Sequence, residues 1–551
     1  MERILLVEPN YNNKYPPIGL MKIAMYHKRR GDYVEFYKGT APSQTISKMD
    51  RVYITSIFTF YFDITIETIH HYTKYMDRSK IFIGGIAVSL LHDVFRTQTG
   101  IENILIGQLL DSSVLGYDDN VNIDSLPLDY DILDDIEYEY CIEDNFFAYA
   151  TRGCKRGCDF CAVTALEPCY YETGNIVEQV SFVRETYGDK RNLMLMDNNT
   201  LYTEKLENIC ADIKALGFEK DVINYIPENP AIIFYNKVDR RISQNKSTWI
   251  IVDRFVVFFK KFVNRIKKES LLEEITIIIK DLDNATTPLD VLVYHKETIV
   301  GVIEKYRTKK PLQRYVDFNQ GIDVRLLTKE KMRILSQLPL RPLRLAYDNF
   351  EMTEPYIQAF RIAYNHGVRH FSNYMLYNYD DSPDDFWQRA YTNILLYNEF
   401  KDVSAFSFPM KFAPVDKTDR LYVGKHWNKK YLSAMNVILN VTNGVIAKEQ
   451  DFFMRAYGST PEEFHEILSM PNEFIKYRDV FEKNGFIELW RERYRKLSKD
   501  DKTVLLKVLS GEKIEYHYSE MLSFYRITKH QAETSKKSIL DYHRLICTPA
   551  V

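Results

Sequence analysis

The chain has 551 residues, of which 45% are apolar and 27% carry charge, and its formal net charge is −3. This length exceeds what one hydrophobic core supports and predicts about three domains. The small net charge excludes binding to nucleic acid through a global excess of basic residues, and no apolar stretch approaches the roughly 18 residues that a membrane span requires.

The start of the chain and most of its cysteines favour a reducing cytoplasm. Residues 1–9 contain an acidic residue, and their apolar run is too short for a signal peptide. We therefore expect a cytoplasmic protein. Four of the seven cysteines are scattered without the spacing of a disulfide framework, namely Cys141, Cys169, Cys210 and Cys547.

Short apolar runs alternate with amphipathic stretches over residues 1–115. This alternation predicts a parallel, doubly wound (Rossmann-like) sheet, whose ligands bind at the carboxyl ends of its strands. Three segments belong to that edge: Pro-Pro-Ile-Gly at 16–19, Ser-Ile-Phe at 56–58, and the pair Gly84 and Gly85. The predicted strands are residues 4–7, 33–37, 52–57, 81–83 and 104–106, and the predicted helices are residues 20–28 and 63–76.

Three cysteines stand close together at Cys154, Cys158 and Cys161, in the spacing C-x3-C-x2-C. Because Gly153 and Gly157 each precede a cysteine, we expect a loop that wraps its thiolates around one inorganic centre. A tetrahedral zinc site would need a fourth ligand, typically from a second C-x2-C or an H-x3–5-H pair, and neither follows. Three thiolates on a four-iron cluster leave one iron without a protein ligand, which suggests catalysis.

This stretch resembles the signature of the radical S-adenosylmethionine enzymes, C-x3-C-x-aromatic-C, with Phe160 in the aromatic position. In that family a 4Fe-4S cluster binds S-adenosylmethionine at its open iron. The resemblance implies that the reduced cluster cleaves this cofactor to methionine and a 5′-deoxyadenosyl radical. It also implies an external electron donor of the flavodoxin or ferredoxin type. A zinc site, or thiols that coincide by chance, remain the alternatives.

The N-terminal region resembles the cobalamin-binding domain that precedes many radical S-adenosylmethionine modules. Its Pro-Pro-x-Gly-Leu, Ser-x-Phe and Gly-Gly elements follow that subgroup in order and spacing. The resemblance implies that Ser56, Gly84 and Gly85 approach the nucleotide tail of cobalamin. Three departures are the missing Asp-x-His-x-x-Gly, Phe58 in place of a small aliphatic residue, and Gln108 after Gly107 where glutamate is common. A scaffold-only domain therefore stands as the alternative.

Further strands from residue 146 onward predict a partial (β/α)6 barrel, whose polar strand ends face the active mouth. Residues 192–196 form one strand, and the resemblance implies that Asp197 and Asn198 at its end meet the amino group of S-adenosylmethionine. The alternative is that polar residues here cap the next helix, expected over 204–215. Later strands are expected within residues 316–327 and at residues 343–347, 370–377 and 404–408.

Two later strand ends resemble other parts of the family's cofactor site. Residues 316–327 resemble its fourth-strand region, which implies that Asn319, Gln320 and Arg325 meet the ribose and carboxylate of S-adenosylmethionine. A guanidinium suits bidentate pairing with a carboxylate, although an ion pair of Arg325 with Asp323 or Glu330 is an equal alternative. The resemblance also places Tyr374 near the adenine.

Residues 222–312 interrupt the barrel rhythm and predict an inserted subdomain. Its basic and aromatic residues, which include Lys260, Lys261, Lys267, Lys268 and residues 305–310, suggest contact with nucleic acid or another anionic surface. Acidic residues are mixed in, so we favour an amphipathic helical subdomain whose charges are solvated.

The chain thus divides into four predicted parts. Residues 1–115 form the cobalamin-binding-like domain, 116–145 an acidic linker, 146–420 the partial barrel with its insertion, and 421–551 a mostly helical domain. The tail helices are expected at residues 427–439, 449–457, 461–469, 475–484, 490–497, 501–510 and 530–542.

These features predict a radical S-adenosylmethionine enzyme that abstracts hydrogen from an unidentified substrate. Methyl transfer is the expected outcome if cobalamin binds. Without it, rearrangement, oxidation or thiolation remain open. An iron–sulfur protein without turnover and a zinc-stabilised interaction module are the alternatives from other classes. No catalytic residue for the radical step is identified by the sequence.

Overall fold

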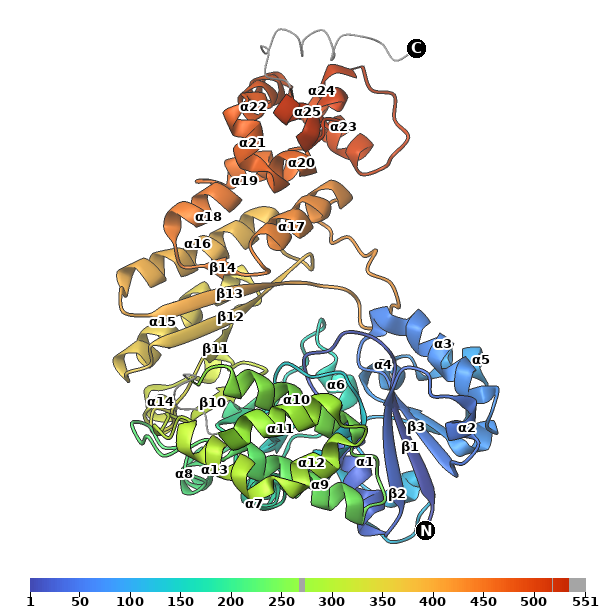
Figure 1. The fold of residues 1–551 in the computed structure, drawn as a ribbon. Helices are drawn as coiled ribbons and strands as arrows, with labels where there is room; N and C mark the ends of the chain where they lie inside the picture. Colours follow the sequence, from blue (N-terminus) through green and yellow to red (C-terminus); the bar gives the residue numbers. More distant parts are fainter. Residues whose placement is uncertain (267–272, 518, 535–551) are drawn as a thin grey trace. The chain divides into compact units, whose positions relative to one another are not determined.

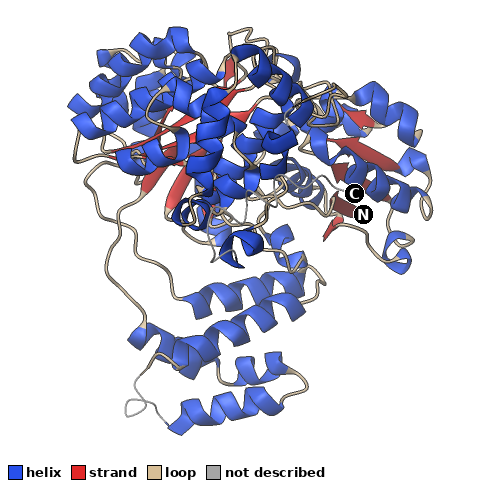
Figure 2. Ribbon diagram, turned by 90° about the horizontal axis from the view of Figure 1, so that it is seen from above, coloured by secondary structure: helices blue, strands red, loops and turns tan. Residues whose placement is uncertain are grey.

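The computed structural model describes residues 1–266, 273–517 and 519–534, and it is a mixed α/β protein with parallel sheets (Figure 1). It divides into two compact units. The first comprises Met1–Gln320, Arg333–Arg341 and Val415–Asp419, and the second comprises Gly321–Met332, Pro342–Pro414 and Arg420–Val551. Helices pack along the strands of each sheet (Figure 2).

The first sheet of unit 1 is parallel throughout, with the strand order β2-β1-β3-β4-β5. Residues 4–7 are fully buried, which explains why β1 is a continuous apolar run. The strand order reverses between β1 and β3, so the polar residues after these strands share one edge. The alternation predicted from the sequence is confirmed: β1 (Arg3–Glu8), α1 (Ile18–Arg29), β2 (Tyr33–Lys38), α2 (Ser43–Ile46), β3 (Arg51–Thr55), α3 (Phe62–Thr73), β4 (Ile81–Gly84), α4 (Ile86–Leu90), α5 (His92–Thr99) and β5 (Ile104–Leu105).

The second sheet of unit 1 is also parallel, with the order β10-β9-β6. The carboxyl ends of its three strands therefore meet at one edge, and the segment after β6 contains the cysteines. A short antiparallel pair of β7 and β8 closes that segment. The elements are β6 (Asn145–Ala148), β7 (Thr151–Arg152), α6 (Val163–Leu166), β8 (Tyr171–Glu172), α7 (Ile176–Tyr187), β9 (Asn192–Leu195), α8 (Leu206–Ala215) and β10 (Tyr315–Phe318).

The chain between α8 and β10 is helical and has a hydrophobic core of its own, in which Phe234 stacks on Phe255 with 4.1 Å between ring centroids. Its helices are α9 (Pro230–Ser243), α10 (Trp249–Val263), α11 (Glu273–Asn284), α12 (Pro288–Tyr294) and α13 (Lys296–Tyr306). Lys267 and Lys268, which contributed to the predicted basic character, lie outside the described residues.

Much of the basic charge around α9 and α10 is paired with acidic residues of the segment 131–135. The pairs are Arg240 with Asp131 at 3.1 Å, Lys237 with Asp134 at 2.9 Å, and Asp135 with Arg241 at 2.9 Å and Lys246 at 2.7 Å. Of the residues on which the predicted basic character rested, Lys260 pairs with Asp283 and Lys309 pairs with Glu304 at 2.9 Å.

Unit 2 contains a sheet of order β11-β12-β13-β14, in which the first three strands are parallel and β14 is antiparallel. The predicted strands at 343–347, 370–377 and 404–408 are therefore found. Proline at the first position and a Ser382–Asp385 capping box begin α16. The elements are β11 (Leu343–Ala346), α15 (Thr353–Asn365), β12 (His370–Tyr377), α16 (Pro383–Glu399), β13 (Ser404–Lys411) and β14 (Ile446–Ala447); α14 is Lys329–Leu335.

The rest of unit 2 is helical and packs around a core that includes Trp490 and Phe474. The predicted tail helix at 530–542 is described as far as Thr534, and its remainder lies outside the described residues. The helices are α17 (Lys429–Val441), α18 (Gln450–Tyr457), α19 (Pro461–Ser469), α20 (Asn472–Lys476), α21 (Arg478–Lys483), α22 (Phe486–Lys496), α23 (Lys499–Leu509), α24 (Ser519–Phe524) and α25 (Lys529–Thr534). Within the described chain, no helix is long and apolar enough to cross a membrane.

Lys430 in α17 is 5% exposed, and its Nζ donates to the Leu468 carbonyl at 2.9 Å and to Asn472 Oδ1 at 3.2 Å. Burial lowers the pKa of Lys430 to about 7. Above that pH the unfolded chain binds more protons than the native protein, so stability rises with pH up to the unfolded pKa of 10.5.

We therefore expect the free energy of unfolding of the wild type to increase relative to Lys430→Met between pH 7 and 10. The slope is at most about 1.4 kcal/mol per pH unit. Denaturant unfolding of both proteins across this pH range measures this difference in the free energy of unfolding. If the free energies of the two proteins changed in parallel with pH, Lys430 would not be buried as a neutral amine.

Candidate metal centre

The cysteines Cys154, Cys158 and Cys161 lie on the loop that leaves β6 and returns at β8, and all three are partly exposed. The Cys161 amide donates to the Cys158 carbonyl at 3.0 Å, which folds the second half of the motif into a turn. The Arg156 amide points at Cys154 Sγ at 3.5 Å. Three partly exposed thiols on one short loop are candidates to bind one inorganic centre.

A glycine is required at position 153 because the loop passes very close to residues 167–169 there. Its φ is +76°, and an added Cβ would lie 2.3 Å from the Cys169 carbonyl oxygen. Gly157 differs, because an added Cβ there would meet nothing within 4 Å and its φ is not left-handed. The backbone of the loop therefore requires a glycine at position 153 and not at position 157.

Replacement of Gly153 by alanine is expected to reduce the amount of cluster that the protein holds severalfold. The left-handed conformation alone costs roughly 1–2 kcal/mol for alanine, and the contact with the Cys169 carbonyl forces the loop to move. Gly157→Ala is the matched control and should retain the wild-type amount. Iron and sulfide per chain after reconstitution measure both, and equal values for the two variants would contradict this explanation.

Asp197, directly after Met196 at the end of β9, ties the cysteine loop to the neighbouring strand. Its carboxylate is 4% exposed and accepts from the amides of Ala150, at 3.1 Å, and Thr151, and from Thr151 Oγ1 at 2.7 Å. Burial raises the pKa of Asp197 to about 6. These contacts give Asp197 an anchoring role that the sequence did not predict. The alternative role of capping the next helix is wrong, because α8 begins after Lys205 without a side-chain cap hydrogen bond.

Glu167 is a second anchor, and the sequence analysis missed it. Its Oε2 accepts from the Gly153 amide at 2.7 Å and from Asn198 Nδ2 at 2.8 Å, while Oε1 accepts from Arg152 Nη2 at 2.7 Å. The side chain of Asn198, expected at the cofactor, is therefore directed to Glu167. The two anchors together hold residues 150–153, which directly precede Cys154.

Asn199 has a buried polar atom, its side-chain Oδ1, whose hydrogen-bonding partner is missing among the residues described at this site. The residue is 5% exposed, and its Nδ2 lies 3.7 Å from Cys154 Sγ. A buried acceptor without a donor requires an explanation, and a bound ligand with an N–H or O–H group would supply one. No local sequence signal distinguishes Asn199 from its neighbours.

The other predicted site residues are divided between the two units. In unit 1, Phe160 is half-buried on the cysteine loop, and Asn319 Oδ1 after β10 accepts from Tyr15 Oη at 2.7 Å, with the exposed Gln320 next to it. In unit 2, Arg325 pairs with Asp323 at 2.7 Å, as one alternative expected.

Tyr374 on β12, also in unit 2, is half-buried and stacks on Phe408 at 5.9 Å between ring centroids. The site that unit 1 assembles by itself thus consists of the cysteines, Asp197, Asn198 and Asn199. The cysteines outside the motif that the structure describes are free, namely Cys141, Cys169 and Cys210. Cys547 lies outside the described residues.

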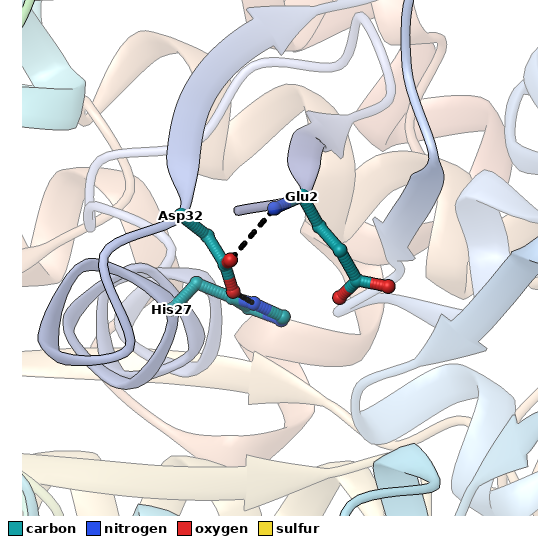
Figure 3. A group of neighbouring side chains, drawn as sticks. All are labelled: Glu2, His27 and Asp32. Atoms are coloured by element: carbon teal, nitrogen blue, oxygen red, sulfur yellow. Dashed lines mark hydrogen bonds and ion pairs between the residues drawn. The ribbon is translucent and has the colours of Figure 1, made fainter.

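A second group of potential metal ligands, Glu2, His27 and Asp32, lies at the amino ends of the strands of the first sheet (Figure 3). His27 Nδ1 bonds Asp32 at 2.9 Å and Nε2 bonds Tyr53 Oη at 3.1 Å, so both ring nitrogens have partners. Burial lowers the pKa of His27 to about 4, which keeps the ring neutral. The group is a hydrogen-bond network around a buried histidine, and a metal on His27 would have to break its bond to either Asp32 or Tyr53.

Comparison with models of protein families and with curated proteins gives no match for this chain. The assignment of a function therefore depends on the cysteine motif and on the geometry around it.

Proposed function

We propose that this protein is a radical S-adenosylmethionine enzyme whose 4Fe-4S cluster is held by Cys154, Cys158 and Cys161. The observation that carries the proposal is the anchored loop with three accessible thiols, beside which Asn199 Oδ1 lacks a donor among the described residues. When bound, the cluster and S-adenosylmethionine supply reductive cleavage of the cofactor to a 5′-deoxyadenosyl radical. The fold proposed with it is a partial barrel of the parallel strands β6, β9, β10, β11, β12 and β13.

The cysteine motif itself favours a cluster over zinc. A tetrahedral zinc site would need a fourth protein ligand, typically from a second C-x2-C or an H-x3–5-H pair, and neither follows the motif. Three thiolates on a four-iron cluster leave one iron without a protein ligand, which is the position that S-adenosylmethionine would take.

The side chains near Cys154 have distinct tasks in this proposal. Asp197 and Glu167 hold the loop, and Asn199 Oδ1 accepts a hydrogen bond from the amino group of S-adenosylmethionine. The amide of Asn199 also donates toward Cys154 Sγ, and hydrogen bonds to cluster sulfur atoms help set the reduction potential. Asn319, Gln320, Arg325 and Tyr374 are further candidates for the cofactor.

The proposal is tested by anaerobic reconstitution of the wild type, Cys158→Ala and Cys169→Ala with iron and sulfide. Cys169 is exposed and outside the motif, so its variant is a matched control. We expect about four irons per chain in the wild type and the control, and a complete loss in Cys158→Ala. A colourless protein that holds zinc would refute the proposal.

The proposed radical abstracts hydrogen from an unidentified substrate. Rearrangement, oxidation and thiolation all remain compatible with the site, whereas methylthiolation is disfavoured because no second cysteine trio precedes the first. An iron–sulfur protein without turnover is the competing function, and it predicts an intact cluster that does not respond to S-adenosylmethionine.

A further inference from the structure

The edge of the first sheet where a ligand would bind is filled by the protein itself. Ligands of a sheet with this strand order bind outside the carboxyl ends of β1 and β3. Glu8 at the end of β1 is fully buried and pairs with Lys38 at 2.6 Å, and it also accepts from Tyr140 Oη. Tyr11, 3% exposed, stacks on Tyr61 with 5.0 Å between ring centroids.

The residues expected to contact the tail of cobalamin have roles within the sheet. Ser56 has no exposed surface, and its Oγ bonds Thr65 Oγ1 at 3.0 Å. An added Cβ at Gly84 would lie 3.0 Å from Leu105 Cβ, and one at Gly85 would lie 2.5 Å from the Ser56 carbonyl oxygen. The glycines are thus explained by close packing of the chain, and the three residues do not fit a corrinoid.

The same domain makes specific contacts with the cysteine loop. With its amide oxygen facing Arg152, Gln108 accepts from Nε at 2.8 Å and from Nη2 at 3.1 Å, and also from Tyr171 Oη at 3.3 Å. Gly107 before it has a φ of +65°, and an added Cβ would lie 3.0 Å from the Leu166 carbonyl oxygen. The Gly-Gln pair therefore contacts both ends of the loop that holds the cysteines.

A buried charge network reinforces this contact. Lys22 of α1 is 2% exposed and lies 3.6 Å from Asp124 Oδ1, while Asp124 Oδ2 pairs with Arg152 at 3.2 Å. The cations of Lys22 and Arg152 lie 4.9 Å and 4.1 Å from the centroid of the Tyr149 ring. Arg152 directly precedes Gly153 and Cys154, so α1 and residue 108 support the loop through one side chain.

We propose that the N-terminal domain carries no corrinoid and instead braces the cysteine loop, with Gln108 as a positioning residue that acts through Arg152. The proposal that this domain braces the loop rests on the proposed function, because it assumes that the loop holds a cluster. The exclusion of a corrinoid is independent of the proposed function, because it follows from the filled edge of the first sheet.

The absence of corrinoid binding is tested by incubating the full chain with hydroxocobalamin, desalting the protein and recording its corrin absorbance. We expect no retained corrin, with the same background in wild type and Ser56→Ala. Retention of about one corrin per chain by the wild type would overturn the exclusion, whether or not the protein takes up iron.

The brace is tested with Gln108→Leu and Gln108→Glu. Leucine removes the acceptor for Arg152, whereas glutamate keeps it, so we expect a severalfold loss of iron per chain in the first and wild-type iron in the second. Equal iron in Gln108→Leu and the wild type would overturn the brace, as would a failure of glutamate to rescue.

A second readout does not require the cluster. In the metal-free protein, the alkylation rate of Cys154, measured by peptide mapping, should rise severalfold in Gln108→Leu and stay at the wild-type value in Gln108→Glu. Failure of the wild type to bind iron would refute the proposed function but leave this comparison intact, and an unchanged rate in Gln108→Leu would overturn the brace.

Discussion

Asp197→Ala is expected to lose most of the bound cluster while the chain remains folded. The substitution leaves three buried donors without their acceptor, namely the Ala150 amide, the Thr151 amide and Thr151 Oγ1. Each unsatisfied donor costs about 1–3 kcal/mol, and detachment of the loop relieves this cost by exposing the donors to water. Iron and sulfide per chain should therefore fall severalfold, with little change in the far-ultraviolet circular dichroism.

Asp159→Ala is the matched control, because Asp159 is exposed on the same loop. It should keep the wild-type iron content. The experiment also separates anchoring from direct binding of S-adenosylmethionine. If Asp197→Ala kept its cluster and lost only affinity for the cofactor, the carboxylate would be a cofactor ligand and the anchoring role would be wrong.

Asn199→Leu is expected to keep the cluster and to weaken S-adenosylmethionine binding about 10- to 100-fold. A hydrogen bond to a charged group contributes about 1.5–3 kcal/mol, and each 1.4 kcal/mol corresponds to about tenfold in affinity. Leucine fills the space of the amide but has no acceptor for the amino group. Titration of the reduced cluster with S-adenosylmethionine, followed by electron paramagnetic resonance, measures the affinity.

Asn199→Asp distinguishes the two hydrogen bonds of this side chain. Aspartate keeps the acceptor oxygen and loses the donor to Cys154 Sγ, so the affinity should remain within a fewfold of the wild type. Wild-type affinity in the leucine variant would contradict the assignment of Asn199 Oδ1 to the amino group. Equal losses in both variants would indicate that the contact with Cys154 is the important one.

The longer strands of both units could be predicted because their signal is local. The fully buried apolar run of β1, and the mostly buried run of β12 with its aromatic residues, identify a strand without knowledge of its neighbours. The pairs β7–β8 and β13–β14 were missed because β7, β8 and β14 have two residues each and show no such pattern by themselves. The equally short β5 was predicted from the alternation of strands and helices that precedes it. The cysteine motif was also local, so its three residues could be named directly.

The contacts that hold the motif could not be predicted, because they join residues far apart in the sequence. Asp197 bonds amides 46 and 47 residues away, and Glu167 joins Gly153 to Asn198. The spacing of residue types along the sequence contains no information about such contacts. The expected roles of Asp197 and Asn198 were therefore assigned by strand end alone, whereas the geometry directs attention to Asn199.

The central claim is that the cysteines hold a cluster that cleaves S-adenosylmethionine. The most direct measurement is the formation of 5′-deoxyadenosine by the anaerobically reconstituted and reduced wild type, Cys158→Ala and Cys169→Ala proteins. We predict that the wild type and Cys169→Ala release 5′-deoxyadenosine at similar rates and that Cys158→Ala releases none above background. An intact cluster in the wild type that yields no 5′-deoxyadenosine would contradict the claim and favour an iron–sulfur protein without turnover.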